Sequence, residues 1–132
     1  MRDQNKVFHL AVPCKNLEET ANYYQALGCS VARSYDDRVT FDFFGDQLVC
    51  HLNPEQIDQK PQMYPRHYGI TFLDKKEFDA VYHTAKQKEL PFFQELTTRF
   101  EGKTEEHITF FLIDPSNNLL EFKYYFDERM VY

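Results

Sequence analysis

VFHLAVP at residues 7–13 and RHYGITFL at residues 66–73 carry the same apolar and polar pattern, and they decide the fold. Each is a short, mostly apolar run of the kind that forms a β-strand. A shift of 58 positions superimposes the two segments and keeps matching residue types beyond them. The shift pairs His9 with His67, Val12 with Ile70, Asn16 with Asp74, Glu19 with Glu77, and Tyr24 with Tyr82. The chain is therefore built from two equivalent halves.

A helix follows the first strand in each half. In the first half Asn16 and Glu19 form a capping box, and Gly28 ends a helix predicted over residues 17–27. In the second half Asp74 and Glu77 occupy the capping positions. The helix after them is predicted from an apolar stripe at helical spacing, formed by Phe78, Val81, Tyr82 and Ala85.

Three more strands are expected in each half, separated by turn residues. Their predicted ranges are 29–35, 38–44 and 47–52, then 92–100, 106–113 and 119–126. Residues 53–65 are polar, contain three prolines and are interpreted as a linker. We therefore expect one α+β domain over residues 1–132, made of two βαβββ modules at 7–52 and 66–126. In each module the helix covers one face of the sheet and leaves the other bare, which is a reason for two modules to pair.

Composition narrows the function classes. The 132 residues are 17% aromatic, which excludes intrinsic disorder. A net charge of −6 disfavours nucleic acids and anionic membranes as partners. Three widely spaced cysteines suit a reducing compartment, where we expect them to be buried and inert. With neither a signal peptide nor a long apolar segment, a cytoplasmic location is predicted.

Strand alternation sorts side chains between the two faces of each sheet. Phe8, Leu10 and Val12 are assigned to the helix side. The bare side then receives His9, His51, His67 and Glu121, each from a different strand. Two histidines and one carboxylate are the ligand set of non-haem Fe(II) oxygenases, and they also resemble three-ligand catalytic zinc sites. Hydrogen-bonded structural histidines and a salt bridge from Glu121 to Lys123 are the alternative interpretation.

The match between the two halves is less certain at His51. The repeat aligns the His51 strand with the Glu121 strand, and a slip of one residue would place Cys50 opposite Glu121 instead. Three further residues are candidates for substrate binding: His107, Arg99 and Tyr125. Each has a plainer alternative, since His107 and Arg99 also suit a surface position and Tyr125 also suits packing. Arg99 and Lys123 would bind an anionic group.

FHLAV at 8–12, HYGITF at 67–72 and DPSNNLLEF at 114–122 together resemble the vicinal oxygen chelate superfamily. This group contains glyoxalase I, bleomycin resistance proteins and extradiol dioxygenases. The resemblance covers residues 7–126. The segment FDFFGDQLVCHL at 41–52 further resembles a bacterial glyoxalase/dioxygenase-like subgroup.

The resemblance implies paired modules that form an open cup of mixed sheet around a divalent metal ion, with the helices outside. It also implies frequent homodimers. Its metal ligands lie on the first, fifth and eighth strands, where this chain has His9, His67 and Glu121. Glyoxalase-type members take a fourth ligand, usually Glu, from the fourth strand, where His51 stands here. Resistance-type members lack the ligands.

Three hypotheses follow. The first is an extradiol-dioxygenase-like enzyme that chelates adjacent oxygens of a small substrate, with Fe(II) as the favoured metal and His51 as fourth ligand or acid/base. The second is a glyoxalase-like lyase or isomerase, for which Zn, Ni or Co would serve and His51 would ligate; Zn, Ni or Mn are the general alternatives to Fe(II). The third is a non-catalytic binding module of the resistance type. The linker of about 13 residues allows the modules to pair within one chain or between two.

Overall fold

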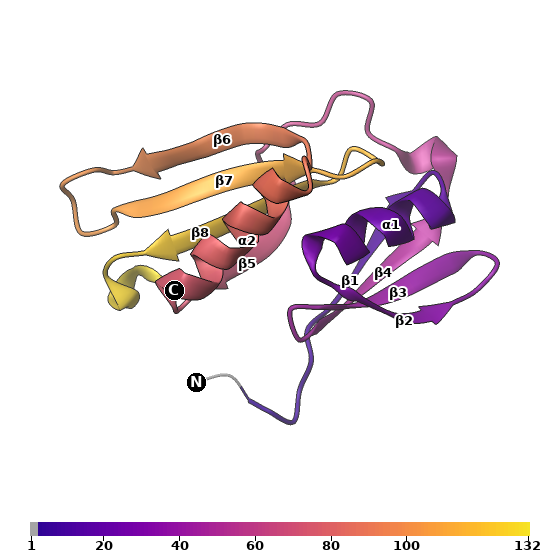
Figure 1. The fold of residues 1–132 in the computed structure, drawn as a ribbon, viewed down its shortest axis with the longest axis horizontal. Helices are drawn as coiled ribbons and strands as arrows, with labels where there is room; N and C mark the ends of the chain where they lie inside the picture. Colours follow the sequence, from indigo (N-terminus) through magenta and orange to yellow (C-terminus); the bar gives the residue numbers. More distant parts are fainter. Residues whose placement is uncertain (1–2) are drawn as a thin grey trace.

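The computed structural model describes residues 3–132, and each half of the chain forms a βαβββ module as predicted (Figure 1). The helices and strands of the first module are β1 (His9–Cys14), α1 (Leu17–Leu27), β2 (Ser30–Ser34), β3 (Arg38–Phe43) and β4 (Asp46–Leu52). Those of the second are β5 (Tyr68–Phe72), α2 (Lys75–Gln87), β6 (Phe92–Arg99), β7 (His107–Ile113) and β8 (Leu119–Tyr125). Short 3-10 turns lie at Pro54–Gln56 and Glu128–Met130.

The α1 helix begins and ends where its capping residues require. The Asn16 side chain accepts a hydrogen bond from the Glu19 backbone N–H at 2.8 Å. At the other end Gly28 adopts a left-handed φ of 111° and ends the helix. In α2 the Asp74 side chain accepts from the Lys76 backbone N–H instead, so this helix begins without the expected bond to Glu77.

Each module contains a four-stranded mixed sheet of the same topology. The strand orders are β1-β4-β3-β2 and β5-β8-β7-β6. The first strand of each module runs parallel to the last, and the remaining pairs are antiparallel. Because the topology repeats, residues of one module have structural counterparts in the other.

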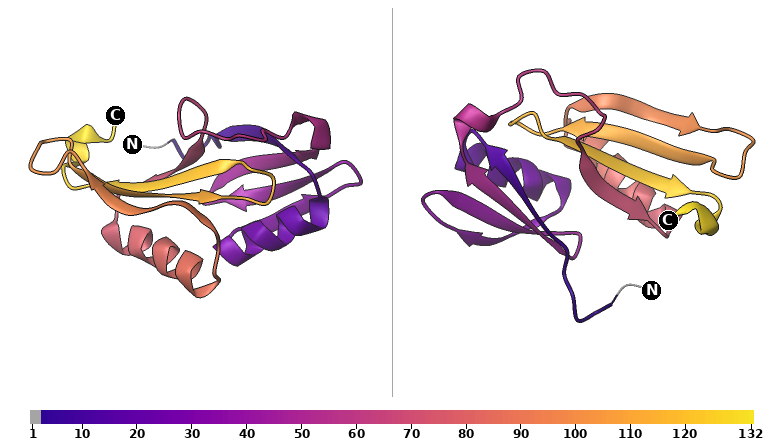
Figure 2. Two further views of the ribbon diagram at one scale, coloured as in Figure 1. Left: turned by 90° about the horizontal axis from the view of Figure 1, so that it is seen from above. Right: turned by 180° about the vertical axis from the view of Figure 1, so that it is seen from behind.

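Both helices lie on the same side of the two sheets (Figure 2). The helix-free faces of both sheets therefore look to the other side. Leu10, Leu48, Leu120 and Phe122 pack in or against the core, so strand alternation assigns His9, His51 and Glu121 to the uncovered side.

The core lies between the sheets and the helices and is dominated by aromatic side chains. Phe44 joins the two modules, with its ring 6.0 Å from that of Phe72 and 5.7 Å from that of Phe122. Leu10 and Val12 pack against this core as predicted. Phe8, in contrast, is 66% exposed. The assignment of Phe8 to the helix side is wrong because β1 begins only at His9.

A buried hydrogen-bond network also connects the modules. Tyr24 on α1 donates to Asp114 Oδ2 at 2.7 Å, and its hydroxyl lies 2.5 Å from that of Tyr68. Asp114 also accepts from the backbone N–H groups of Ser116 and Asn118. Burial raises the pKa of Asp114, which these hydrogen bonds partly oppose.

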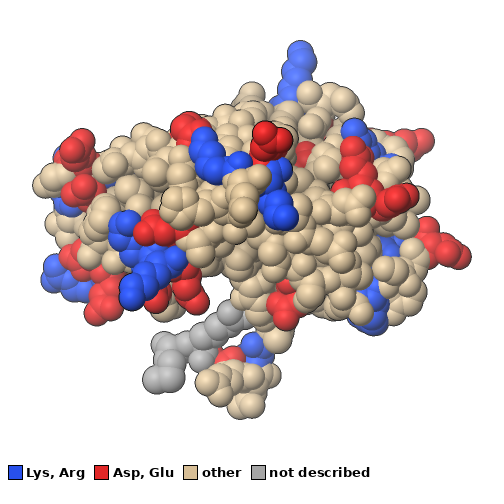
Figure 3. All heavy atoms as spheres, in the orientation of Figure 1, with Lys and Arg blue, Asp and Glu red and all other residues tan. Residues whose placement is uncertain are grey.

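The surface carries charges of both signs. On the face in Figure 3, Lys and Arg side chains alternate with Asp and Glu and do not gather into one basic patch. Within residues 3–132, no helix is both long and apolar enough to span a membrane.

Candidate functional site

The helix-free face of the second module brings two predicted ligands together. His67 immediately precedes β5, and Glu121 lies in the neighbouring strand β8, opposite Gly69. Their side chains approach so that His67 Nε2 lies 3.2 Å from Glu121 Oε1. The close approach of the two strands needs the glycine, since a Cβ at Gly69 would lie 1.6 Å from the Glu121 carbonyl oxygen.

Hydrogen bonding fixes the tautomer of His67. Its Nδ1 lies 2.5 Å from the Met63 carbonyl oxygen, which can only accept, so Nδ1 carries the proton. In the neutral ring, Nε2 then turns a lone pair toward the Glu121 carboxylate. Both atoms are hydrogen-bond acceptors in these forms, so a proton or a bound cation would have to bridge them.

Glu121 is held in a matching way. Its side chain is buried, and Oε2 accepts a hydrogen bond from Thr109 Oγ1 at 2.6 Å. Oε1 is left facing His67, with Lys123 Nζ 3.9 Å away. Histidine and carboxylate ligands of metal ions are usually oriented by such outer hydrogen bonds, so the donor set of the His67–Glu121 pair fits a divalent metal.

His9 lies in the first module and is separate from this pair. It is exposed on β1, and its Nδ1 lies 2.7 Å from Gln47 Oε1. The Gln47 oxygen accepts, so His9 also presents Nε2 as the free ring nitrogen. Across residues 3–132, however, no cluster of three or more His, Cys, Asp or Glu side chains could hold a metal ion. One chain therefore brings together two of the three predicted ligands.

Strand register corrects the match between the modules. Ala11 and Gly69 occupy equivalent positions in the two modules, because the repeat relates residues that are 58 positions apart. Ala11 pairs with Val49 and Gly69 pairs with Glu121, so Val49 is the counterpart of Glu121. Neither His51 nor Cys50 occupies that place.

His51 pairs with Pro13, as Lys123 pairs with Thr71, so His51 is the counterpart of Lys123. It lies four residues beyond Gln47, about 13 Å along β4. A fourth ligand beside His9 therefore cannot come from His51 of the same chain.

The three predicted substrate-binding residues share one row across the second sheet. His107 pairs with Arg99 on one side and Tyr125 on the other. The His107 ring is buried, 4.5 Å from the Tyr125 ring centroid, and its Nδ1 faces the Glu105 carbonyl oxygen at 2.9 Å. A fully surface position for His107 is thus excluded.

Three residues at the site were missed by the sequence analysis. They are Thr109, which holds Glu121; Gln47, which holds His9; and Tyr64, whose hydroxyl accepts a hydrogen bond from Arg99 at 2.5 Å. Alternation along residues 106–113 and 47–52 would have placed Thr109 and Gln47 on the helix-free faces. No comparable signal marks Tyr64, because it lies in the irregular linker.

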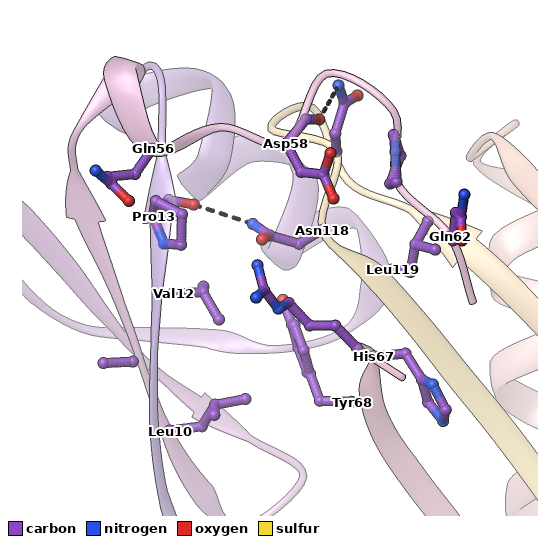
Figure 4. A pocket seen from close by; sticks show the side chains of 14 residues that line it. Leu10, Val12, Pro13, Gln56, Asp58, Gln62, His67, Tyr68, Asn118 and Leu119 are labelled. Carbon is purple, nitrogen blue, oxygen red and sulfur yellow. Dashed lines mark hydrogen bonds between the residues drawn. The ribbon is translucent and has the colours of Figure 1, made fainter. Parts of the chain in front are cut away.

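The seam between the modules contains a pocket of about 300 Å³ (Figure 4). Its walls come from β1, the linker, the start of β5 and the turn before β8, and Asn118 spans it by donating to the Pro13 carbonyl oxygen at 3.0 Å. The His67 ring points away from the centre of this pocket in Figure 4. A second hollow, of about 190 Å³, lies on the helix-free face and is lined by His67, Thr71, Glu121 and Lys123 among others.

The three cysteines, Cys14, Cys29 and Cys50, are buried and free, as expected. Burial raises the pKa of all three thiols, that of Cys29 to about 12. None of them therefore carries chemistry at this site.

Paired βαβββ modules with both helices on one side, and histidine and glutamate side chains on the other, define the glyoxalase fold class. A family model described as the Glyoxalase/Bleomycin resistance protein/Dioxygenase superfamily matches residues 6–122. The chain belongs to this family, and the family expected from the sequence is confirmed.

Solved structures agree. A glyoxalase/bleomycin resistance protein/dioxygenase from Alicyclobacillus acidocaldarius is 62% identical, with 100% of both chains covered and a TM-score of 0.97. The fosfomycin resistance protein FosX from Listeria monocytogenes is 15% identical over 96% of this chain and 98% of its own, with a TM-score of 0.73. Lactoylglutathione lyase from Agrobacterium tumefaciens is 16% identical over 93% and 96%, with a TM-score of 0.65. The last two show a shared fold. No curated protein matches the chain.

Proposed function

We propose that this protein is a metal-dependent enzyme that binds adjacent oxygens of a small substrate on a divalent ion held by His9, His67 and Glu121. The observation that carries the proposal is the His67–Glu121 pair, in which Nε2 and Oε1 face each other at 3.2 Å. Met63 and Thr109 hold the far side of each group, so both free donor atoms converge on one point.

The third ligand, His9, is proposed to come from a second copy of the chain. Two observations support this. The helix-free faces of the two modules look to the same side and do not face each other, and no three-ligand cluster forms within residues 3–132. In a two-fold dimer the first module of one copy would lie over the second module of the other and complete two equivalent sites. In this proposal the homodimer is needed for the site, because each copy supplies His9 to the His67–Glu121 pair of the other.

The number of ligands favours one reaction class. Val49 occupies the place symmetric to Glu121, so the site offers two imidazoles and one carboxylate, and no fourth ligand. This set with open positions is the one used by non-haem Fe(II) oxygenases. When bound, the metal would act as a Lewis acid and substrate template, with Fe(II) additionally supporting oxygen chemistry. We therefore propose extradiol-dioxygenase-like cleavage ahead of glyoxalase-like lyase chemistry with Zn, Ni or Mn.

The remaining polar residues are proposed to position substrate. His107, Arg99 and Tyr125 form one row across the sheet, four residues along β8 from Glu121, and would line the cup farther from the metal. His51, as the counterpart of Lys123, would face the cup from the opposite module and orient the substrate or move a proton. A cytoplasmic location remains part of the proposal.

Metal content per chain tests the proposal directly. Protein purified without chelators or a histidine tag is expected to hold close to one divalent ion per chain, measured by elemental analysis. His67→Ala removes one ligand and is expected to abolish stoichiometric metal. His83→Ala, on the exposed side of α2, is the matched control and is expected to retain it. Unchanged metal in folded His67→Ala protein would refute the ligand assignment.

The identity of the metal selects the activity assay. Iron leads to oxygen-uptake measurements with catechols, and nickel or zinc to assays with 2-oxoaldehyde–thiol adducts. His51→Ala is expected to keep its metal and to lose turnover, because His51 lies beyond ligand distance of His9. Absence of metal even after anaerobic reconstitution would identify the protein as a non-catalytic binding module.

Mixing two inactive variants tests the exchange between copies. His9→Ala and His67→Ala chains each lack a ligand in both sites of their own dimers. Unfolding and refolding them together would give mixed dimers with one intact site each, so roughly a quarter of the wild-type metal and activity should return. No recovery, with mixed dimers demonstrated by mass spectrometry, would place all three ligands in one chain.

A further inference from the structure

Two positively charged side chains of the second sheet lie near the His67–Glu121 pair. Arg99 donates a hydrogen bond to the Tyr64 hydroxyl, and the Tyr64 ring lies 5.7 Å from the His67 ring. Lys123 Nζ lies 3.9 Å from Glu121 Oε1. Arg99 shares the row of Tyr125, and Lys123 lies between that row and Glu121, so both cations lie on the same side of the carboxylate along the strands.

Arg99 has no carboxylate partner among the described residues, and Lys123 shares its partner, Glu121, with His67. Among the residues from 3 to 132, Arg99 makes no ion pair, and its polar contact is the neutral Tyr64 hydroxyl. Lys123 has Glu121 as its carboxylate neighbour, at a distance longer than a hydrogen bond.

Aromatic rings support the two cations and leave their charges unneutralised. The Lys123 ammonium lies 5.5 Å from the Tyr125 ring centroid, and the Arg99 guanidinium lies 6.0 Å from that of Tyr64 and 5.7 Å from that of Phe100. Both side chains are partly buried. Lys123 also lines a hollow of about 190 Å³, together with His67, Thr71 and Glu121.

The net charge of the proposed metal site indicates the charge of the ligand that it would bind. A divalent ion with two neutral imidazoles and one carboxylate keeps one positive charge, to which Arg99 and Lys123 add two more. Once metal engages Glu121, Lys123 has no other carboxylate partner within the described residues. Uncompensated positive charge in a partly buried hollow is unfavourable, so the complete site calls for an anionic ligand.

We infer that the substrate carries an oxyanion, a carboxylate or a phosphonate-type group, that Arg99 and Lys123 bind beside the metal-chelating oxygens. This inference rests on the proposed function and specifies its substrate class. Arg99 offers a planar fork that matches two oxygens of such a group, and Lys123 offers a compact point charge. Tyr64, which accepts a hydrogen bond from Arg99, has its ring 5.7 Å from that of His67.

Anion binding to the metal-loaded dimer tests the inference. The protein would be loaded with Mn²⁺, and inorganic phosphate and acetate would be titrated separately by calorimetry. Lys123→Met and Arg99→Gln are each expected to weaken binding of the preferred anion about tenfold or more, since each removes a charge-assisted contact. Lys76→Met, on the outer face of α2, is the matched control and should bind the anion as the wild type does.

The number of metal ions bound per chain distinguishes a failure of the oxyanion site from a failure of the proposed metal-dependent function. Lys123→Met should hold Mn²⁺ at least as tightly as the wild type, because a cation beside Glu121 is removed. Equal anion affinity in the wild type and both variants, with one Mn²⁺ per chain, would overturn the oxyanion site and leave the proposed function intact. A wild type that binds no metal would overturn the proposed function itself. Preference for phosphate or acetate identifies which oxyanion the site takes.

Discussion

Glu121 uses its two carboxylate oxygens for different purposes. Oε2 is bound by Thr109, and Oε1 faces His67. A buried carboxylate is costly without compensation, and a single hydroxyl supplies part of it while fixing the orientation of the group. The residue that makes Glu121 usable as a ligand is therefore a threonine on the next strand.

Replacing Thr109 by valine keeps the shape of the side chain and removes the hydroxyl. We expect the variant to lose about 1–3 kcal/mol of unfolding free energy, measured by urea denaturation, because Glu121 stays buried with one hydrogen bond fewer. Metal affinity should fall about 10–100-fold. Thr97→Val, on the exposed partner position of β6, should change neither quantity. Wild-type metal affinity in Thr109→Val would show that Thr109 does not orient the ligand.

Gly69 allows β5 to lie against Glu121. Gly69→Ala would put a methyl group 1.6 Å from the Glu121 carbonyl oxygen, so the two strands could not keep their pairing. We expect destabilisation above about 4 kcal/mol or insoluble protein. Gly102→Ala meets no atom within 4 Å but has a φ of +80°, and should cost only about 1 kcal/mol. Similar costs for both variants would mean that the strands can separate freely.

At the scale of elements, helix ends and strand faces could be predicted from the sequence because short local patterns determine them. Helix α1 begins and ends at the predicted residues because Asn16 and Gly28 act within one turn. Alternation placed His67 and Glu121 on one face for the same reason. Register was harder, because the pairing of β1 with β4 depends on contacts between distant segments. Val49, and not His51, therefore matches Glu121.

The Tyr24 hydroxyl connects α1 to two elements of the second module. Tyr24→Phe removes its hydrogen bonds with Asp114 and Tyr68 and leaves the buried groups with fewer partners. We expect a loss of about 1–3 kcal/mol in urea denaturation. Tyr82→Phe removes a hydroxyl that bonds Glu95 at the surface and should cost no more than about 0.5 kcal/mol. Equal stability of both variants would show that the buried network does not hold the modules together.

At the scale of the whole molecule, the repeat predicted two modules but not which faces meet. The linker is long enough for the modules to pair within one chain or between two chains, and its length does not favour either arrangement. Packing of Phe44 against Phe72 and Phe122, with both helices on one side, decides the arrangement within the chain. These contacts lie far apart in sequence, so the separation of His9 from the His67–Glu121 pair could not be derived from local patterns.

If a site contains His9 from one copy and His67 with Glu121 from the other, metal binding and dimerisation must strengthen each other. Metal that binds only the dimer, at a hundred times its dissociation constant, stabilises each site by about 2.7 kcal/mol. The dimer dissociation constant should therefore fall by up to about 10⁴-fold on metal addition, measured by analytical ultracentrifugation. His9→Ala, a change at an exposed residue, should fold normally and lose most of this response. A dimer constant indifferent to metal, in wild-type protein that binds the ion, would mean that each chain holds its metal alone.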